Sequence, residues 1–276
     1  MIAGWRATLD LRFAACGERT IVAAQRHIGP LLVQKMLHPA DDPACHAIIV
    51  HPPGGIVGGD RLEISALAEA GSHALLTTPG ATRWYRTAGL AAQQTVRLTG
   101  RAGSVLEWLP QETLYYEGCD AENRIDIVVE KGAHVIGWEI ARLGRLNSSE
   151  RFAAGRVRQS FTLHVGDQPH WVERGELQSR TRALASSVGL AAKSVFGTIV
   201  CYPVAGEMAQ RLLSRLRGHT GAEGSHCGVT LLGECIVARY LGDSIEHARG
   251  QMVRWWSLMR EELLGLPAIP PRIWRT

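Results

Sequence analysis

The sequence of 276 residues lacks the features that place a protein outside the cytoplasm or in a membrane. Its six cysteines are scattered and include no C-x-x-C pair, and a chain of this length does not need a disulfide framework. The N-terminal residues lack the apolar segment of a secretory signal. The most apolar stretch, residues 183–205, is interrupted by Lys193 and Pro203, so it falls short of the roughly 18 apolar residues of a membrane span. We therefore expect a cytoplasmic protein with no membrane partner.

A strong excess of charge of one sign is also missing. The chain has 30 basic and 26 acidic residues, a net charge of +4, and only three of the basic residues are lysines. The densest arginine run, from Arg142 to Arg158, is interpreted as a solvated basic edge, with an acid-binding face as the alternative. Because aromatic residues that stack on bases are not interleaved with these arginines, nucleic acid is not expected as a partner.

Motifs of nucleophilic, phosphate-binding or zinc chemistry are absent as well. The sequence contains no G-x-S-x-G and no two-plus-two zinc spacing. Residues 51–60, HPPGGIVGGD, are rich in glycine, but a P-loop requires Lys-Ser/Thr after its last glycine and Asp60-Arg61 follows here. We expect these glycines to supply positive φ angles in a tight turn between β layers.

What the sequence does contain is a repeated β pattern. Residues 5–13 alternate between apolar and polar, as in a half-buried strand. Three similar strand, glycine-turn, strand units follow, with Gly71, Gly103 and Gly132 separated by 32 and 29 residues. A short β unit of this kind cannot bury its apolar face alone, so the repeat predicts stacked β layers of solenoid or sandwich type.

The last quarter of the chain changes to a helical period. Two helices are predicted, near residues 205–218 and 244–264, within a single domain that spans 1–276. Asp243 is predicted to cap the start of the second helix, and Gly265 follows its end. The apolar stripe of this helix is interpreted as core packing rather than as a cofactor site.

Three carboxylates lie in or beside strands where apolar residues would suffice: Asp60, Glu107 and Glu112. Each faces either the outer surface of its strand or a wet cavity. The paired acids of a glycosidase would look the same in the sequence, so this alternative stays open.

Several motifs resemble those of the UreD family of urease accessory proteins, called UreH in some species. They are residues 51–60, residues 76–86 (LTTPGATRWYR) and residues 106–112 (LEWLPQE), and the resemblance extends over nearly the whole chain. The motif residues singled out are His51, Pro52, Pro53, Gly54, Gly55, Gly58, Gly59, Asp60, Pro79 and Gly80.

The resemblance implies a scaffold rather than an enzyme. The fold it implies is mainly β, a two-layer, β-helix-like stack of strands with two helices near the C-terminus. The partners it implies are UreF, the GTPase UreG through UreF, and apo-urease. The assembly would deliver nickel to the urease active site through an internal, water-filled passage, with transient Ni²⁺ as cargo and no permanently bound cofactor.

Weak, exchangeable oxygen ligands suit such a passage, because a closed cage of histidine and cysteine would trap the ion. Asp60, Glu107 and Glu112 are therefore the candidate residues of a transient nickel path, and no catalytic residue is assigned. Two alternatives remain at this point: a β-solenoid carbohydrate-active enzyme, and an interaction module without an ion path.

Overall fold

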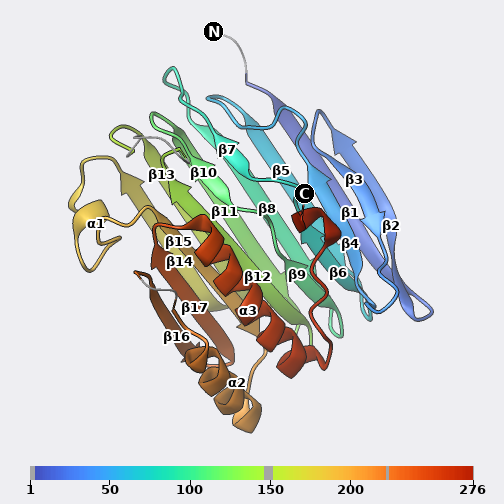
Figure 1. Ribbon diagram of the computed structural model, residues 1–276. Coiled ribbons are helices and arrows are strands. Elements are labelled where there is room, and N and C mark those ends of the chain that lie inside the picture. Colours follow the sequence, from blue (N-terminus) through green and yellow to red (C-terminus); the bar gives the residue numbers. More distant parts are fainter. Residues whose placement is uncertain (1–3, 146–151, 222–223, 276) are drawn as a thin grey trace.

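Two β-sheets lie face to face and form most of the molecule (Figure 1). The computed structural model describes residues 4–145, 152–221 and 224–275. The seven-stranded sheet contains, in spatial order, β14 (Gln168–Gln178), β13 (Arg156–Val165), β11 (Asp120–Val129), β8 (Ala92–Gly100), β5 (Arg61–Ala68), β1 (Arg6–Cys16) and β2 (Arg19–Ile28).

The other sheet has ten strands. Its main path contains β16 (His226–Leu232), β17 (Cys235–Gly242), β15 (Val195–Tyr202), β12 (His134–Leu143), β9 (Val105–Trp108), β6 (His73–Thr77), β4 (Cys45–Val50) and β3 (Leu32–Leu37). Two short strands, β10 (Thr113–Tyr115) and β7 (Thr82–Trp84), pair beside β12.

The chain passes back and forth between the sheets, and this movement builds the stack. From β5 to β13 the longer strands fall alternately in the two sheets, and the neighbours that result are parallel, as in β5 with β8 and β6 with β9. Antiparallel strands close the edges, among them β2 and β14. The predicted fold class, mainly β with β-helix-like stacked coils, is confirmed.

The repeated glycines occupy equivalent turns of successive coils. Gly71, Gly103 and Gly132 have φ angles of 74°, 75° and 91°. The N–H of Gly71 donates to the carbonyl of Gly103, and the N–H of Gly103 donates to that of Gly132. These turns stack directly on one another, as the repeat predicted. The expected positive φ in the 51–60 segment is also present, at Gly54 and Gly59.

Alternating burial follows from the sequence pattern. On β1, Ala7, Leu9, Leu11 and Phe13 point into the space between the sheets and are buried, whereas Asp10 on the other face is exposed. Register continues this apolar row across the sheet, since Leu9 pairs with Ile64 of β5. Rows of this kind form the main core between the two sheets.

Two helices cover the outer face of the ten-stranded sheet, α2 (Gly206–Gly218) and α3 (Ile245–Leu264), close to the predicted ranges (Figure 1). Met252 and Trp256 of α3 are fully buried against this sheet, so the stripe is core packing as predicted. A four-residue helix, α1 (Arg182–Ala185), was not predicted, because it buries no side chain and so has no apolar stripe. A short 3₁₀ turn, η1 (Arg272–Arg275), ends the described chain.

The predicted cap of α3 was wrong by one residue. Ser244 is the N-cap, and its hydroxyl accepts a hydrogen bond from the N–H of His247. Asp243 instead accepts hydrogen bonds from Lys193 and Ser194. The carboxylate that the pattern assigned to the helix therefore ties a preceding loop to it. Gly265, in the left-handed conformation, ends the helix as predicted. No helix within the described ranges is long and apolar enough to cross a membrane.

Candidate functional site

A row of polar side chains runs across the inner face of the seven-stranded sheet. Gln94 of β8, Asn123 of β11 and Gln159 of β13 are register partners on adjacent parallel strands. The side-chain amide of Gln94 donates to Oδ1 of Asn123 at 3.2 Å, and Nε2 of Gln159 donates to the hydroxyl of Tyr115 at 3.0 Å. Neighbouring rows are apolar, so these three amides, called the amide row below, form a polar stripe through the core.

A cavity of about 140 Å³ lies at one end of the amide row. Asn123, Gln159, Thr198, Glu173 and Glu139 are among its lining residues. It is bounded by β11, β13 and β14 of one sheet and by β12 and β15 of the other. Both sheets therefore present oxygen atoms to this cavity.

Among the carboxylates that line this cavity, Glu139 of β12 has a pKa that differs clearly from its ordinary value. Burial raises its pKa to about 7, against an opposing hydrogen bond from Thr113. The hydroxyl of Thr113 donates to Oε1 of Glu139 at 2.5 Å, and Asn123 donates to the same oxygen at 3.4 Å. No described basic side chain forms an ion pair with Glu139. A carboxyl group with such a pKa binds and releases a proton near neutral pH.

A second cavity, of about 250 Å³, lies at the other end of the amide row. Gln94 is among its lining residues, and the hydrogen bond from Gln94 to Asn123 connects it with the cavity at Glu139. Family motif residues surround this second cavity: His51, Pro52, Gly54, Gly55, Pro79 and Gly80. The two motif segments, far apart in the sequence, therefore build one site.

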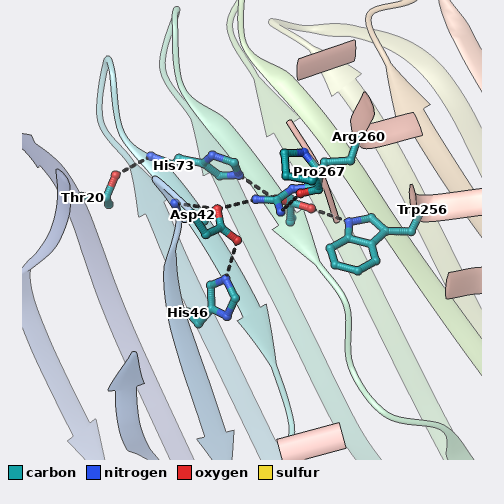
Figure 2. A network of polar contacts seen from close by, with 9 residues as sticks. Thr20, Asp42, His46, His73, Trp256, Arg260 and Pro267 are labelled. Atoms are coloured by element: carbon teal, nitrogen blue, oxygen red, sulfur yellow. Dashed lines mark hydrogen bonds and ion pairs between the residues drawn. The ribbon is translucent and has the colours of Figure 1, made fainter. Parts of the chain in front are cut away.

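A different polar cluster lies between the ten-stranded sheet and α3 (Figure 2). Glu107 of β9 is fully buried and accepts hydrogen bonds from Nε1 of Trp256 at 2.5 Å and from Nε of Arg260 at 3.1 Å. Nε2 of His73 lies 2.6 Å from Oε1 of the same carboxylate. Burial acts to raise the pKa of Glu107, but the contacts with His73 and Arg260 outweigh it and lower the pKa below its ordinary value.

Asp42 completes this cluster on the far side of Arg260. Nη2 of Arg260 donates to Oδ1 of Asp42 at 2.6 Å, and Nε2 of His46 lies 3.0 Å from Oδ2 (Figure 2). Burial acts to raise the pKa of Asp42, but the hydrogen bonds from His46 and Arg260 hold it well below its usual range. Arg260 also donates to the carbonyl of Pro267 at 2.7 Å. This set, called the charge network below, fastens α3 and the start of the C-terminal tail to the sheet.

The three carboxylates predicted from the sequence lie in separate surroundings. Glu107 belongs to the charge network. Asp60 accepts hydrogen bonds from the N–H groups of Trp5 and Val57 at 2.8 and 2.9 Å, and so holds the 51–60 segment against the start of β1. Glu112 lies 3.6 Å from Arg249. No interaction within the described ranges joins two of the three. Those ranges also contain no group of three or more histidine, cysteine, aspartate or glutamate side chains placed so that they could hold a metal ion.

Sequence reasoning missed Glu139, the amide row, Asp42 and Arg260. A signal existed for two of these. Glu139 stands between Trp138 and Ile140 in an apolar strand, which is the pattern that singled out Glu107. Gln94 and Asn123 are 29 residues apart, the spacing of the glycine repeat, so they occupy equivalent positions in successive coils.

The stacked coils, the helical cover and the polar stripe between the sheets define a β-solenoid-like protein with a partly polar interior. The sequence profile of the UreD urease accessory protein family matches residues 6–275. The chain is 42% identical over 273 residues to a urease accessory protein UreD of Dechloromonas aromatica (strain RCB), covering 99% of this chain and 95% of the relative. It is 43% identical over 273 residues to that of Janthinobacterium sp. (strain Marseille), with 98% and 92% covered. The chain belongs to the UreD family of urease accessory proteins.

Family membership decides between the broad alternatives left by the sequence. The relatives are named as accessory proteins of urease, so the chain is an accessory protein with a role in urease maturation rather than an enzyme. The alternative of a carbohydrate-active enzyme is therefore wrong.

Proposed function

We propose that the chain is a cytoplasmic scaffold that binds UreF, and UreG through it, and docks on apo-urease. In this proposal nickel passes to the urease active site through the polar space between the two sheets. The observation that supports this most directly is the amide row, which links the motif-lined cavity to the cavity at Glu139. The scaffold role and the passage are separate parts of the proposal and are tested separately.

The chemistry of the row suits a cation in transit. Amide, hydroxyl and carboxylate oxygens bind Ni²⁺ more weakly than a set of histidines and cysteines does, so the ion can exchange from one position to the next. Glu139 adds a negative charge where the ion would otherwise lose its hydration without compensation. Since burial raises the pKa of Glu139 to about 7, an arriving cation displaces a proton at little cost near neutral pH.

The carboxylates predicted from the sequence form an alternative path. Glu107 is less suited to a cation, because Arg260 already occupies it and would repel a second positive charge. Asp60 uses both oxygens to hold backbone N–H groups. The geometry therefore favours Glu139 over Asp60, Glu107 and Glu112, and one experiment compares the two paths.

The test is urease maturation in cells that express the whole urease cluster with a variant of this chain. Glu139→Gln keeps the shape and removes the charge. We expect it to lower the nickel content of purified urease by about two- to fivefold, in line with the loss of one charge beside the ion. The matched control is Glu63→Gln, whose side chain is 40% exposed on the outer face of β5 and should leave the nickel content unchanged.

A second arm carries Asp60→Ala together with Glu107→Gln. Low nickel content in this arm, with normal content in Glu139→Gln, would assign the path to the sequence-predicted carboxylates. Normal nickel content in both arms would refute an ion path through the chain. Co-purification of UreF and UreG with each variant tests the scaffold role: if wild type captures neither protein, that role is wrong whatever the nickel content.

A further inference from the structure

Four large apolar side chains are exposed around the 51–60 segment. Trp5, Val57, Tyr85 and Leu90 are 58%, 45%, 40% and 47% exposed. We call these four residues the glycine-loop surface. Apolar side chains scattered singly over a protein are ordinary, but a group of them around one loop marks an interaction site.

Backbone hydrogen bonds hold the segments that carry three of these side chains, those of Trp5, Val57 and Tyr85. The carboxylate of Asp60 binds the N–H groups of both Trp5 and Val57. The N–H of Tyr85 donates to the carbonyl of Ile56 at 2.8 Å. A Cβ atom on Gly55 would lie 2.1 Å from the ring of Tyr85, so glycine is required for the ring to pack there. A surface ordered in advance loses little conformational entropy when a partner binds.

The motif-lined cavity opens beside this surface, since Gly54, Gly55 and Arg83 line it and Pro52 at its rim is exposed. Its volume of about 250 Å³ lies below the range of about 300–1,000 Å³ typical of small-molecule sites. A cavity of this size suits a single anchoring side chain from another protein. Nε2 of His51, also in the lining, is buried and has no hydrogen-bond partner among the described residues.

The charge around the surface indicates what kind of partner fits. Arg6, Arg61, Arg83 and Arg86 are exposed at this end of the molecule, and none forms an ion pair with a described carboxylate. Several other arginines of the seven-stranded sheet are paired with carboxylates, among them Arg12, Arg97 and Arg156. Four guanidinium groups without an ion pair, beside exposed apolar side chains, complement an acidic surface.

We infer that the glycine-loop surface is a protein docking site whose partner presents acidic residues around one apolar or aromatic anchor, and that the anchor enters the motif-lined cavity. This inference rests on the proposed function, because UreF and apo-urease are the probes that test it. Beyond the proposed function, it names the glycine-loop surface as the part of this chain that binds, and it says that the partner's surface is acidic around an apolar or aromatic anchor.

The experiment measures the dissociation constants of the full chain for purified UreF and for purified apo-urease. The test variant is Leu90→Ser with Arg83→Glu. The matched control is Val188→Ser with Arg182→Glu, two exposed residues in and just after α1. We expect the test variant to weaken binding of one of the two probes by about tenfold or more and the control to leave both unchanged. For the probe whose binding the test variant weakens, the affinity of the wild-type chain should also fall as the salt concentration is raised from about 0.05 to 0.5 M.

The urea midpoint of the first variant shows whether it folds. If it does not, a second variant, Val57→Ser with Arg61→Glu, takes its place in the same binding experiment. Unchanged binding of both probes by a folded test variant would overturn the inference and leave the scaffold role standing. Equal losses in the test variant and the control would also overturn it. If wild type binds neither probe, both the proposed function and the inference are wrong.

Discussion

The charge network is buried, whereas in the amide row Asn123 is buried and Gln94 and Gln159 are half-buried. The two polar clusters also differ in how completely their groups are paired. In the charge network, Arg260 contacts Asp42 and Glu107 at 2.6 and 3.1 Å, and both carboxylates accept further hydrogen bonds. Next to the amide row, Glu139 accepts hydrogen bonds from the hydroxyl of Thr113 and, at 3.4 Å, from the amide of Asn123, and a cavity lies beside it.

In the function proposed above, this difference separates groups with a structural role from groups that would line a passage. Fully paired charges inside a protein hold elements together, and they resist exchange because each partner would be left unpaired. Groups that are partly satisfied and beside a cavity can change partners at low cost. The pKa values follow the same division, lowered at Asp42 and Glu107 and raised at Glu139.

The largest effect is expected from Arg260→Leu. Arg260 is fully buried, and its loss leaves Asp42 and Glu107 charged, buried and without their cation. We expect the free energy of unfolding, measured by urea denaturation, to fall by about 3–5 kcal/mol. The matched control is Arg215→Ala, because Arg215 contacts Glu261 and Glu262 at the surface with its side chain 36% exposed.

We expect Arg215→Ala to lower the free energy of unfolding by about 0–1 kcal/mol, the usual contribution of an exposed ion pair. Equal losses in the two variants would show that the network is no more than another set of surface-like ion pairs. The contrast with the amide row would then disappear.

A smaller effect is expected from Glu139→Gln, and it depends on pH. The fold raises the pKa of Glu139 from 4.5 to about 7, so the folded chain binds this proton more tightly than the unfolded chain does. Wild type therefore loses stability as pH rises from about 4.5 to about 7, and the glutamine variant does not. At pH 8 we expect the variant to be more stable by about 1–3 kcal/mol, less than the full shift implies because the cavity relieves part of the burial.

Urea unfolding of both proteins between about pH 4.5 and 8 measures this difference. The gap between them should widen across this interval. Stability curves that stay parallel would mean that the fold does not raise the pKa of Glu139, which would remove the main distinction from Glu107.

Local and repeated features of this fold were predictable from the sequence. The stacking of Gly71, Gly103 and Gly132 followed from near-equal spacing, because one unit repeated along the chain meets its neighbours in the same register. The range of α3 followed from its apolar period and from Gly265. These features depend on residues close in sequence or related by the repeat.

The charge network was not predictable, for a physical reason. Arg260 lies 218 positions from Asp42 and 153 from Glu107, and no repeat relates them. An arginine in a helix is ordinarily exposed, so its burial depends on partners that only the tertiary structure brings near. The isolated acid in an apolar strand was recognised at Glu107 and missed at Glu139, and this pattern does not indicate which groups either acid contacts.

The smallest effect is expected within the amide row itself, from Gln94→Leu. This change removes the donor to Oδ1 of Asn123, and Gln94 lines a cavity, so that oxygen can find another donor. We expect the free energy of unfolding to change by no more than about 1 kcal/mol.

The matched control is Gln251→Leu on α3, where the fully buried amide donates to the carbonyl of His219 at 2.6 Å. Its loss should cost about 1–3 kcal/mol, because a fully buried side chain gives up its hydrogen bonds with the carbonyl of His219 and with Arg254. Urea denaturation of both variants gives the comparison. If Gln94→Leu costs as much as Gln251→Leu, the amide row is closed packing like the rest of the core, and its role as a passage would have to be abandoned.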